Sequence, residues 1–266
     1  MGTDILAINP GSTSTKIAVF RDGKEFFTEE VSHDPKKILE FGGIPEQKEF
    51  REQVIKEIIK EKNYDIKNLS ATVGRGGMII GLHGGGYKVT KKLCDGMANP
   101  NNPKHASSLG AILAYDIGEP LGIPSYIYDS TMGCELLDIA KITGIAELEK
   151  YGCCHVLNSK AQARKYAEKI GINYKNLNLI VCHMGGGVTT NAQVNGEIID
   201  TGAYDDGPMA PERSGGVPLL LFKDICFDGK HTKADIEDLI SGKGGLYSYL
   251  GTTDCIEIEK RISARD

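Results

Sequence analysis

The chain has 266 residues and a formal net charge of −5, with 40% hydrophobic and 25% charged residues. This composition is typical of an ordinary soluble globular protein, and the length suffices for two domains with their own cores. Charges of both signs are interspersed and no window has eighteen apolar residues, so we expect neither a nucleic-acid partner nor a membrane span.

The chain opens with a predicted antiparallel meander. Apolar and β-branched residues predict strands over 4–9, 15–21 and 26–31. The dipeptide Asp22-Gly23 stands between the second and third strands, and it is typical of a two-residue hairpin turn.

A helix and two buried strands follow the meander. Residues 46–62 predict an amphipathic helix, because apolar residues recur at helical spacing while lysines and glutamates fill the other face. Two short apolar runs, 70–73 and 125–128, predict strands on either side of a helical segment at 105–117 that stops at Gly118.

The opening pattern then returns in the second half of the chain. Residues 179–200 predict a strand, a glycine turn, a second strand, an Asn195-Gly196 hairpin and a third strand. We interpret this repeat as a duplicated core and predict an α/β fold with two lobes, residues 1–150 and 151–266. Duplicated cores of this kind face each other across a cleft, so both small-residue turns are expected to point at one ligand.

The remainder of the second half predicts helices only. One is expected over 233–241, with Thr232 as its cap and Gly242 as its stop, and another over 247–263. By internal symmetry, the second lobe is expected to lack its last two parallel strands and a helix.

Both small-residue turns have a composition that suits a phosphate group. The first carries hydroxyl side chains from Ser12 to Thr15 and ends on Lys16, and the second is bare backbone at Gly185, Gly186 and Gly187. Small residues allow successive backbone N–H groups to converge on phosphate oxygens. The structural alternative for both segments is an ordinary polar turn, because turns favour small polar residues.

Two further features indicate a reducing compartment. The seven cysteines are odd in number and contain no C-x-x-C pair, so reduced, mostly buried thiols are expected. The N-terminal residues show no basic stretch ahead of an apolar one, so no secretory signal is predicted. We therefore expect a cytoplasmic protein.

Several motifs occur in a fixed order between Asp4 and about Asp254: INPGSTSTKIAVF, VGRGGM, KHASSLGAILAYDIGEPLGIPSYIYD, HVLNSKAQARKYA, VCHMGGGVTTNAQVNGEIID and DDGPMAPERSGGVP. Together they resemble the acetate and butyrate kinases of the sugar kinase, Hsp70 and actin superfamily, and butyrate kinases in particular. The resemblance implies a two-lobe duplicated ribonuclease H-like fold of the actin-like ATPase type, with an incomplete second lobe.

The same resemblance implies how the phosphates are bound. Asn9, Ser12, Ser14 and Lys16 match the loop that works near the transferred phosphate and its magnesium, and Asn9 and Ser12 are the expected metal contacts. The glycines at 185–187 match the turn that cradles the nucleotide phosphates. ATP and Mg²⁺ are therefore the expected cofactors.

The resemblance also implies the catalytic side chains. Arg75 and Arg213 match the two arginines that hold the carboxylate substrate and the phosphoryl group, while Asp129, His155 and His183 match acidic and histidine positions near the reaction. The structural alternative for both histidines is that they are hydrogen-bonded core residues.

The implied reaction is reversible transfer of phosphoryl from ATP to a short-chain carboxylate such as butyrate, which yields an acyl phosphate and ADP. Two anions must meet, and arginine suits this task because its planar group binds carboxylate or phosphate bidentately. A carboxylate is already ionised at neutral pH, so His155 is interpreted as a hydrogen-bond donor rather than a base, with a covalent phosphohistidine as the alternative. The family tends to form dimers or larger assemblies, so a homo-oligomer is expected.

Two departures from the family pattern affect the nucleotide side. Asp254 falls where the family begins its adenosine-side contacts, yet Ile256 stands where an arginine is usual. Butyrate kinases continue beyond this point with another glycine-rich turn and an acidic residue linked to magnesium. Three explanations stay open: a truncated kinase, one half of a split enzyme completed by a second chain, or a non-catalytic binding or regulatory module.

Overall fold

The computed structural model describes residues 2–99, 105–203 and 205–265. Its chain divides into two compact units, Met1–Gly133 and Cys134–Asp266. The division therefore follows Gly133, whereas the sequence expectation placed it after residue 150. None of the described helices is long and apolar enough to cross a membrane.

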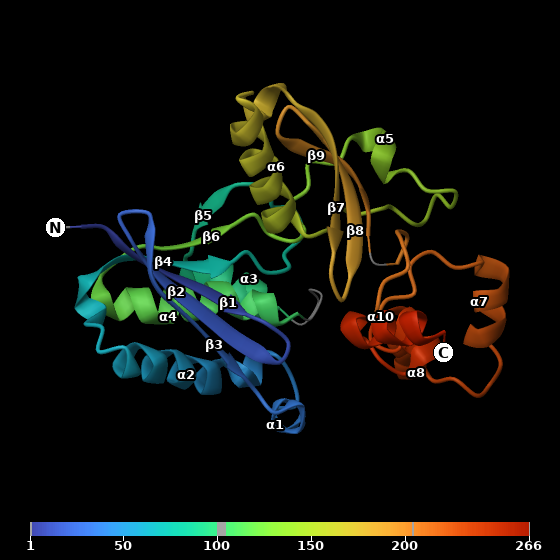
Figure 1. Ribbon diagram of the computed structural model, residues 1–266, viewed down its shortest axis with the longest axis horizontal. Coiled ribbons are helices and arrows are strands. Elements are labelled where there is room, and N and C mark those ends of the chain that lie inside the picture. The colour runs from blue at the N-terminus through green and yellow to red at the C-terminus, as the bar shows by residue number, and fades with distance from the viewer. Residues whose placement is uncertain (1, 100–104, 204, 266) are drawn as a thin grey trace. The chain divides into compact units, whose positions relative to one another are not determined.

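The first unit is built on one six-stranded mixed sheet (Figure 1). Its strands are β1 (Asp4–Pro10), β2 (Ser14–Arg21), β3 (Lys24–Ser32), β4 (Leu69–Arg75), β5 (Gly86–Lys88) and β6 (Ser125–Tyr128). Its α-helices are α1 (Pro35–Glu40), α2 (Lys48–Glu61), α3 (Lys91–Met97) and α4 (Leu109–Gly118). The strand order is β3-β2-β1-β4-β6-β5, in which β1 is antiparallel to β2 and parallel to β4, and β4 is parallel to β6.

The second unit contains an antiparallel sheet of order β7-β8-β9. Its strands are β7 (Asn178–Met184), β8 (Val188–Val194) and β9 (Glu197–Gly202). Its α-helices are α5 (Asp138–Lys141), α6 (Val156–Ile170), α7 (Leu219–Cys226), α8 (Lys233–Ile240), α9 (Leu246–Leu250) and α10 (Cys255–Ala264). Within the described part of this unit, β7 pairs with β8 alone, whereas its counterpart β1 pairs on both sides.

The predicted α/β fold with a repeated meander is confirmed, and both hairpin turns explain why the repeat is visible in the sequence. Asp22 and Gly23 have φ angles of 52° and 77°, and Asn195 and Gly196 have φ angles of 55° and 86°. Positive φ at both central residues defines the turn whose twist matches that of the flanking strands, and Asn, Asp and Gly adopt it most easily.

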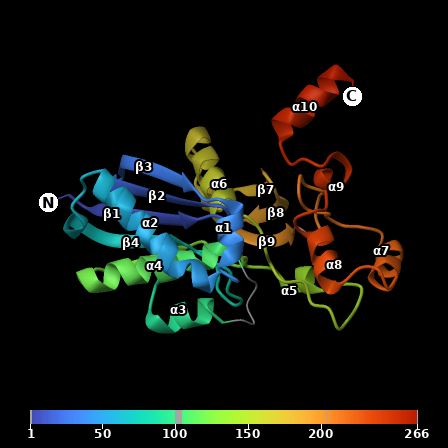
Figure 2. The ribbon, with the colours of Figure 1, turned by 90° about the horizontal axis from the view of Figure 1, so that it is seen from below.

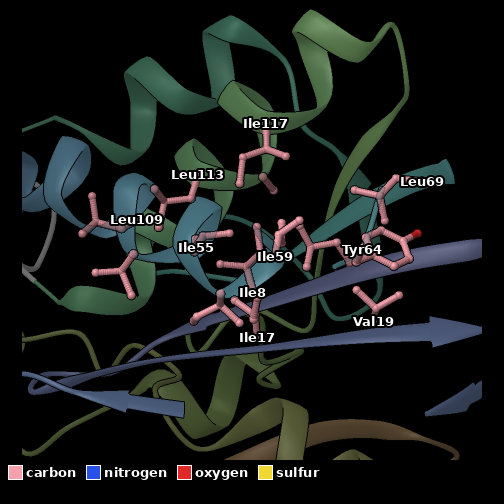
Figure 3. Packing of buried hydrophobic residues seen from close by; sticks show 14 residues of the cluster. Ile8, Ile17, Val19, Ile55, Ile59, Tyr64, Leu69, Leu109, Leu113 and Ile117 are labelled. Atoms are coloured by element: carbon pink, nitrogen blue, oxygen red, sulfur yellow. The ribbon is translucent and has the colours of Figure 1, made fainter. Parts of the chain in front are cut away.

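The core of the first unit lies between the sheet and helices α2 and α4, which cover the same face (Figure 2). Alternate residues of β1 and β2 point to this face, among them Ile8 and Ile17. Figure 3 shows these two side chains near Ile55 and Ile59 of α2. Alternate residues give the strands one apolar face, and helical spacing gives α2 another. These two faces pack together in one apolar layer.

Several elements differ from the sequence expectation. The helix expected over 247–263 is two helices, because Gly251 adopts a left-handed φ of 67° that ends α9 and Asp254 then starts α10. The segment expected as helix over 105–117 begins as a 3₁₀ turn, Ala106–Ser108, before α4. The sequence analysis did not predict the following elements: α1, β5, α3, α5, α6 and α7.

The apolar layer predicts that the stability of the first unit depends strongly on the buried side chains of α4. Leu113 is fully buried in this layer, so Leu113→Ala is expected to lower the free energy of unfolding by about 2–5 kcal/mol. Leu39 of α1 is 80% exposed, and Leu39→Ala should cost less than about 0.5 kcal/mol. Urea unfolding followed by circular dichroism compares the two variants, and equal losses would contradict this placement of the core.

Candidate functional site

Three of the expected site residues stand at the carboxyl ends of neighbouring strands in the first unit. Asn9 lies near the end of β1, Arg75 ends β4, and Asp129 directly follows β6. These strands are adjacent and parallel, so their carboxyl ends lie along one edge of the sheet. Open α/β sheets bind their ligands outside this edge.

The loop between β1 and β2 is exposed at the same edge. Ser12 and Thr13 are exposed at its tip, and Asn9 and Lys16 face each other across the two strands that flank it. The Lys16 ammonium lies 3.7 Å from a Glu30 carboxylate oxygen, and both side chains are about half exposed. Exposed ion pairs contribute only about 0–1 kcal/mol, so Glu30 competes weakly with an anionic ligand for this cation.

Arg75 is a half-buried cation at the end of β4. Its guanidinium makes no hydrogen bond or ion pair with any residue in the described ranges, and burial lowers its pKa below the ordinary value. Guanidinium nonetheless stays protonated at neutral pH. The backbone of Arg75 is held tightly, because a Cβ on Gly110 of α4 would lie 2.6 Å from the Arg75 carbonyl oxygen. A fixed, unpaired and partly desolvated cation of this kind suits a carboxylate or a phosphate.

Asp129 is buried and adopts a left-handed φ of 45°. Its N–H donates to the Gly85 carbonyl (3.0 Å), and its Oδ1 accepts from the Gly85 N–H (2.8 Å). Aspartate tolerates this conformation better than most residues, and such positions concentrate at functional sites. The two bonds fasten the segment before β5 to the end of β6, beside Arg75.

In the second unit, two of the expected residues form a stacked pair. The rings of His155 and His183 have centroids 3.6 Å apart and planes 10° apart. His155 Nδ1 lies 2.9 Å from the Thr189 hydroxyl, and the Asn158 side-chain nitrogen lies 2.8 Å from His183 Nδ1. These contacts leave Nε2 of His155 as the ring nitrogen that faces away from Thr189.

The glycine turn and the PERSGG segment meet beside this pair. The Gly185 N–H donates to the Gly187 carbonyl (3.1 Å), and the Glu212 N–H donates to the Gly186 carbonyl (3.2 Å). A Cβ on Gly187 would lie 3.7 Å from the His155 ring and 3.9 Å from Arg213 Cγ. Arg213 is half-buried and pairs with the Glu212 carboxylate at 2.9 Å.

Asp254 has a local structural role instead. Its Oδ1 accepts from the N–H groups of Ile256 (2.9 Å) and Glu257 (3.2 Å), so the carboxylate caps α10. The adenosine-side contact expected for this residue stays a prediction.

The residues present fit a phosphate-bound magnesium ion better than a protein-bound one. The described part of the chain contains no group of three or more His, Cys, Asp or Glu side chains that could hold a metal. Asn9 and Ser12 offer neutral oxygens at the exposed loop. Magnesium commonly keeps several waters and binds through substrate phosphates with few protein ligands, which agrees with this set.

Sequence reasoning missed three residues that organise these groups: Arg51 behind the first loop, Thr189 against His155, and Glu212 against Arg213. Arg51 carried a detectable signal, because it stands on the apolar stripe of α2 four residues before Ile55. Thr189 and Glu212 lie inside the motifs but have no signal of their own.

Comparison with known proteins gives one consistent result. A model of the acetokinase family matches residues 139–266. A probable butyrate kinase of Listeria monocytogenes is 42% identical over 268 residues, covering 100% of this chain and 76% of the relative. A probable butyrate kinase of Clostridium botulinum is 44% identical with the same coverage. An acetate kinase of Entamoeba histolytica shares the fold with a TM-score of 0.75 at 19% identity, covering 99% of this chain and 72% of that one.

The capping contacts of Asp254 predict a graded effect on stability. Asp254→Ala should lower the free energy of unfolding by about 1 kcal/mol, because two N–H groups of α10 lose their acceptor. Asp254→Asn should stay close to the parent, since asparagine caps equally well. Thermal unfolding of both variants checks this expectation, and an asparagine variant as unstable as the alanine variant would contradict the capping role.

Proposed function

The chain belongs to the acetokinase family as a homologue of butyrate kinases, and we propose that it transfers phosphoryl reversibly between ATP and a short-chain carboxylate such as butyrate. The observation that carries the proposal is the half-buried guanidinium of Arg75, which pairs with none of the described residues; Arg75 ends β4 at the same sheet edge as the exposed loop between β1 and β2. That edge combines a carboxylate-binding group with a phosphate-binding one.

The chemistry explains why cations are needed on both substrates. A carboxylate and a γ-phosphate repel each other, and the loose transition state spreads negative charge over the phosphoryl oxygens. We assign Arg75 to the carboxylate and Lys16, with the loop backbone, to the phosphate. Arg213 is assigned to the transferring group, where it would exchange its Glu212 partner for the incoming anion.

The histidines are assigned to hydrogen bonding rather than to proton abstraction. The acceptor carboxylate is ionised at neutral pH and needs no base. The contact between Nδ1 of His155 and Thr189 orients the ring, so Nε2 is the nitrogen that would donate to a phosphoryl oxygen. The stack against His183 fixes the plane of that ring.

ATP and magnesium belong to this proposal. Magnesium, when bound with the nucleotide, offsets the charge of its phosphates. Asn9 and Ser12 are the residues of this chain that we assign to it, through an amide and a hydroxyl oxygen. The glycines at 185–187 are assigned to the nucleotide phosphates, because a backbone without side chains permits close approach.

A second candidate function is binding of a carboxylate or a phosphate without turnover. It is favoured by one observation: Arg75, Asp129 and the β1–β2 loop all belong to the first unit, whose sheet holds three adjacent parallel strands. A regulatory or binding module would need only that unit.

Acyl hydroxamate formation with ATP, magnesium, butyrate and hydroxylamine tests the kinase proposal. Arg75→Ala and Arg213→Ala should each lower turnover by roughly 10²–10³, because each removes a preorganised donor to developing charge. Arg265→Ala removes an exposed arginine and serves as the control.

Parent-like turnover in either of the first two variants would remove that arginine from the mechanism. A folded parent chain that forms no hydroxamate yet binds butyrate would favour the binding module instead.

A further inference from the structure

Arg51 of α2 is fully buried, and its guanidinium is directed at the loop between β1 and β2. Its Nη1 donates to the Ser14 carbonyl at 2.6 Å. Its Nη2 donates to the carbonyls of Gly11 (2.8 Å) and Ser12 (3.2 Å). One side chain therefore holds three of the four carbonyl groups of residues 11–14, which we call the phosphate loop.

The remaining contacts of Arg51 are also to neutral acceptors. Its Nη1 lies 3.1 Å from the Thr15 hydroxyl, and its Nε and Nη2 donate to Gln47 Oε1 at 3.1 and 2.9 Å. No carboxylate pairs with it within the described residues, and burial lowers its pKa. Burying a charge that is balanced by neutral dipoles costs free energy of desolvation. A leucine at this core position would carry no charge and would avoid that cost.

The fourth carbonyl of the phosphate loop is held from the same side. The His33 N–H donates to the Thr13 carbonyl at 2.8 Å, and the Gly11 N–H donates to the Ser14 carbonyl at 2.8 Å. His33 is itself buried, and its Nε2 lies 2.8 Å from the Thr15 hydroxyl. All four carbonyl oxygens are therefore occupied by protein donors.

The direction of the carbonyls decides the direction of the N–H groups. In a trans peptide the C=O and N–H bonds point in opposite directions. The N–H groups of Ser12 and Thr13 share peptide units with the carbonyls of Gly11 and Ser12, so they point away from Arg51. In the described part of the chain these two N–H groups donate to no acceptor, and both residues are exposed.

We infer that Arg51 is the positioning residue of the phosphate loop: it draws the loop carbonyls inward and thereby presents the Ser12 and Thr13 N–H groups to a phosphate. Adjacent outward N–H groups form a concave anion site, and the buried guanidinium holds them in that arrangement before the ligand arrives. This inference rests on the proposed function, in which the phosphate loop binds the transferred phosphoryl group.

A titration of the ¹⁵N-labelled chain with inorganic phosphate at constant ionic strength tests the inference. The amide signals of Ser12 and Thr13 are expected to shift in a saturable manner. In Arg51→Met, which keeps the volume but removes every donor, the Kd for phosphate should rise by about tenfold or more. Tyr64→Phe is the matched control, because it removes a buried hydrogen bond to Asp4 from the same core. Its Kd should stay within about twofold of the parent although its stability falls.

If Arg51→Met does not fold, the Kd for phosphate is measured for Arg51→Lys, which keeps the charge but loses the planar group that reaches three carbonyls. A folded lysine variant with weakened phosphate binding supports the inference. Parent-like phosphate binding in a folded Arg51 variant overturns the inference. So does a folded parent whose Ser12 and Thr13 amide signals do not shift when phosphate is added. A parent whose phosphate binding depends on Arg51 but which forms no hydroxamate keeps the inference and removes the kinase proposal, so the two fail separately.

Discussion

The apolar contact between helix α2 and the first sheet is the interaction on which the phosphate loop depends. Ile55 and Ile59 pack on Ile8 and Ile17, and this layer sets the position of the whole helix relative to β1 and β2. Arg51 lies one turn earlier on the same buried face, so the packing that stabilises the unit also delivers a guanidinium to the loop. The stability of the unit and the position of the loop are therefore coupled through one helix, and a shift of α2 would move the loop as well.

The groups that we propose for anion binding are held by different means in the two units. In the first, the buried Arg51 holds the loop carbonyls, and Arg75 has no partner among the described residues at the strand ends. In the second, bare glycine backbone is fastened by the N–H of Glu212, and Arg213 is already paired with that residue's carboxylate. In the proposed function, the first arrangement is held before the ligand arrives, whereas in the second Arg213 would exchange Glu212 for the ligand.

Local patterns account for what could be predicted. The hairpins at Asp22-Gly23 and Asn195-Gly196 depend on two residues each, and the capping box of Thr232 and Asp235 depends on four, so short windows contain them. The expected helix over 247–263 is wrong, because an isolated glycine in a helical pattern does not by itself show whether it ends the helix, and Gly251 ends α9 with a left-handed φ. Helix α6 is not among the predicted elements, although most of its residues lie in the motif HVLNSKAQARKYA. Arg51 carries a charge, yet its spacing places it on the apolar stripe of α2.

The sequence by itself determined the repeated meander, strands β4 and β6, helix α2 and the small-residue composition of the two turns, because each of these follows from residues that are near neighbours in the chain. Only the tertiary structure decided which side of the phosphate loop faces the protein. Arg51 and Gly11 are separated by 40 positions, and neither residue carries a local signal of the other. The same holds for Arg75: that no residue in the described part of the chain pairs with its guanidinium depends on all the segments folded around it, and no window of sequence contains that information.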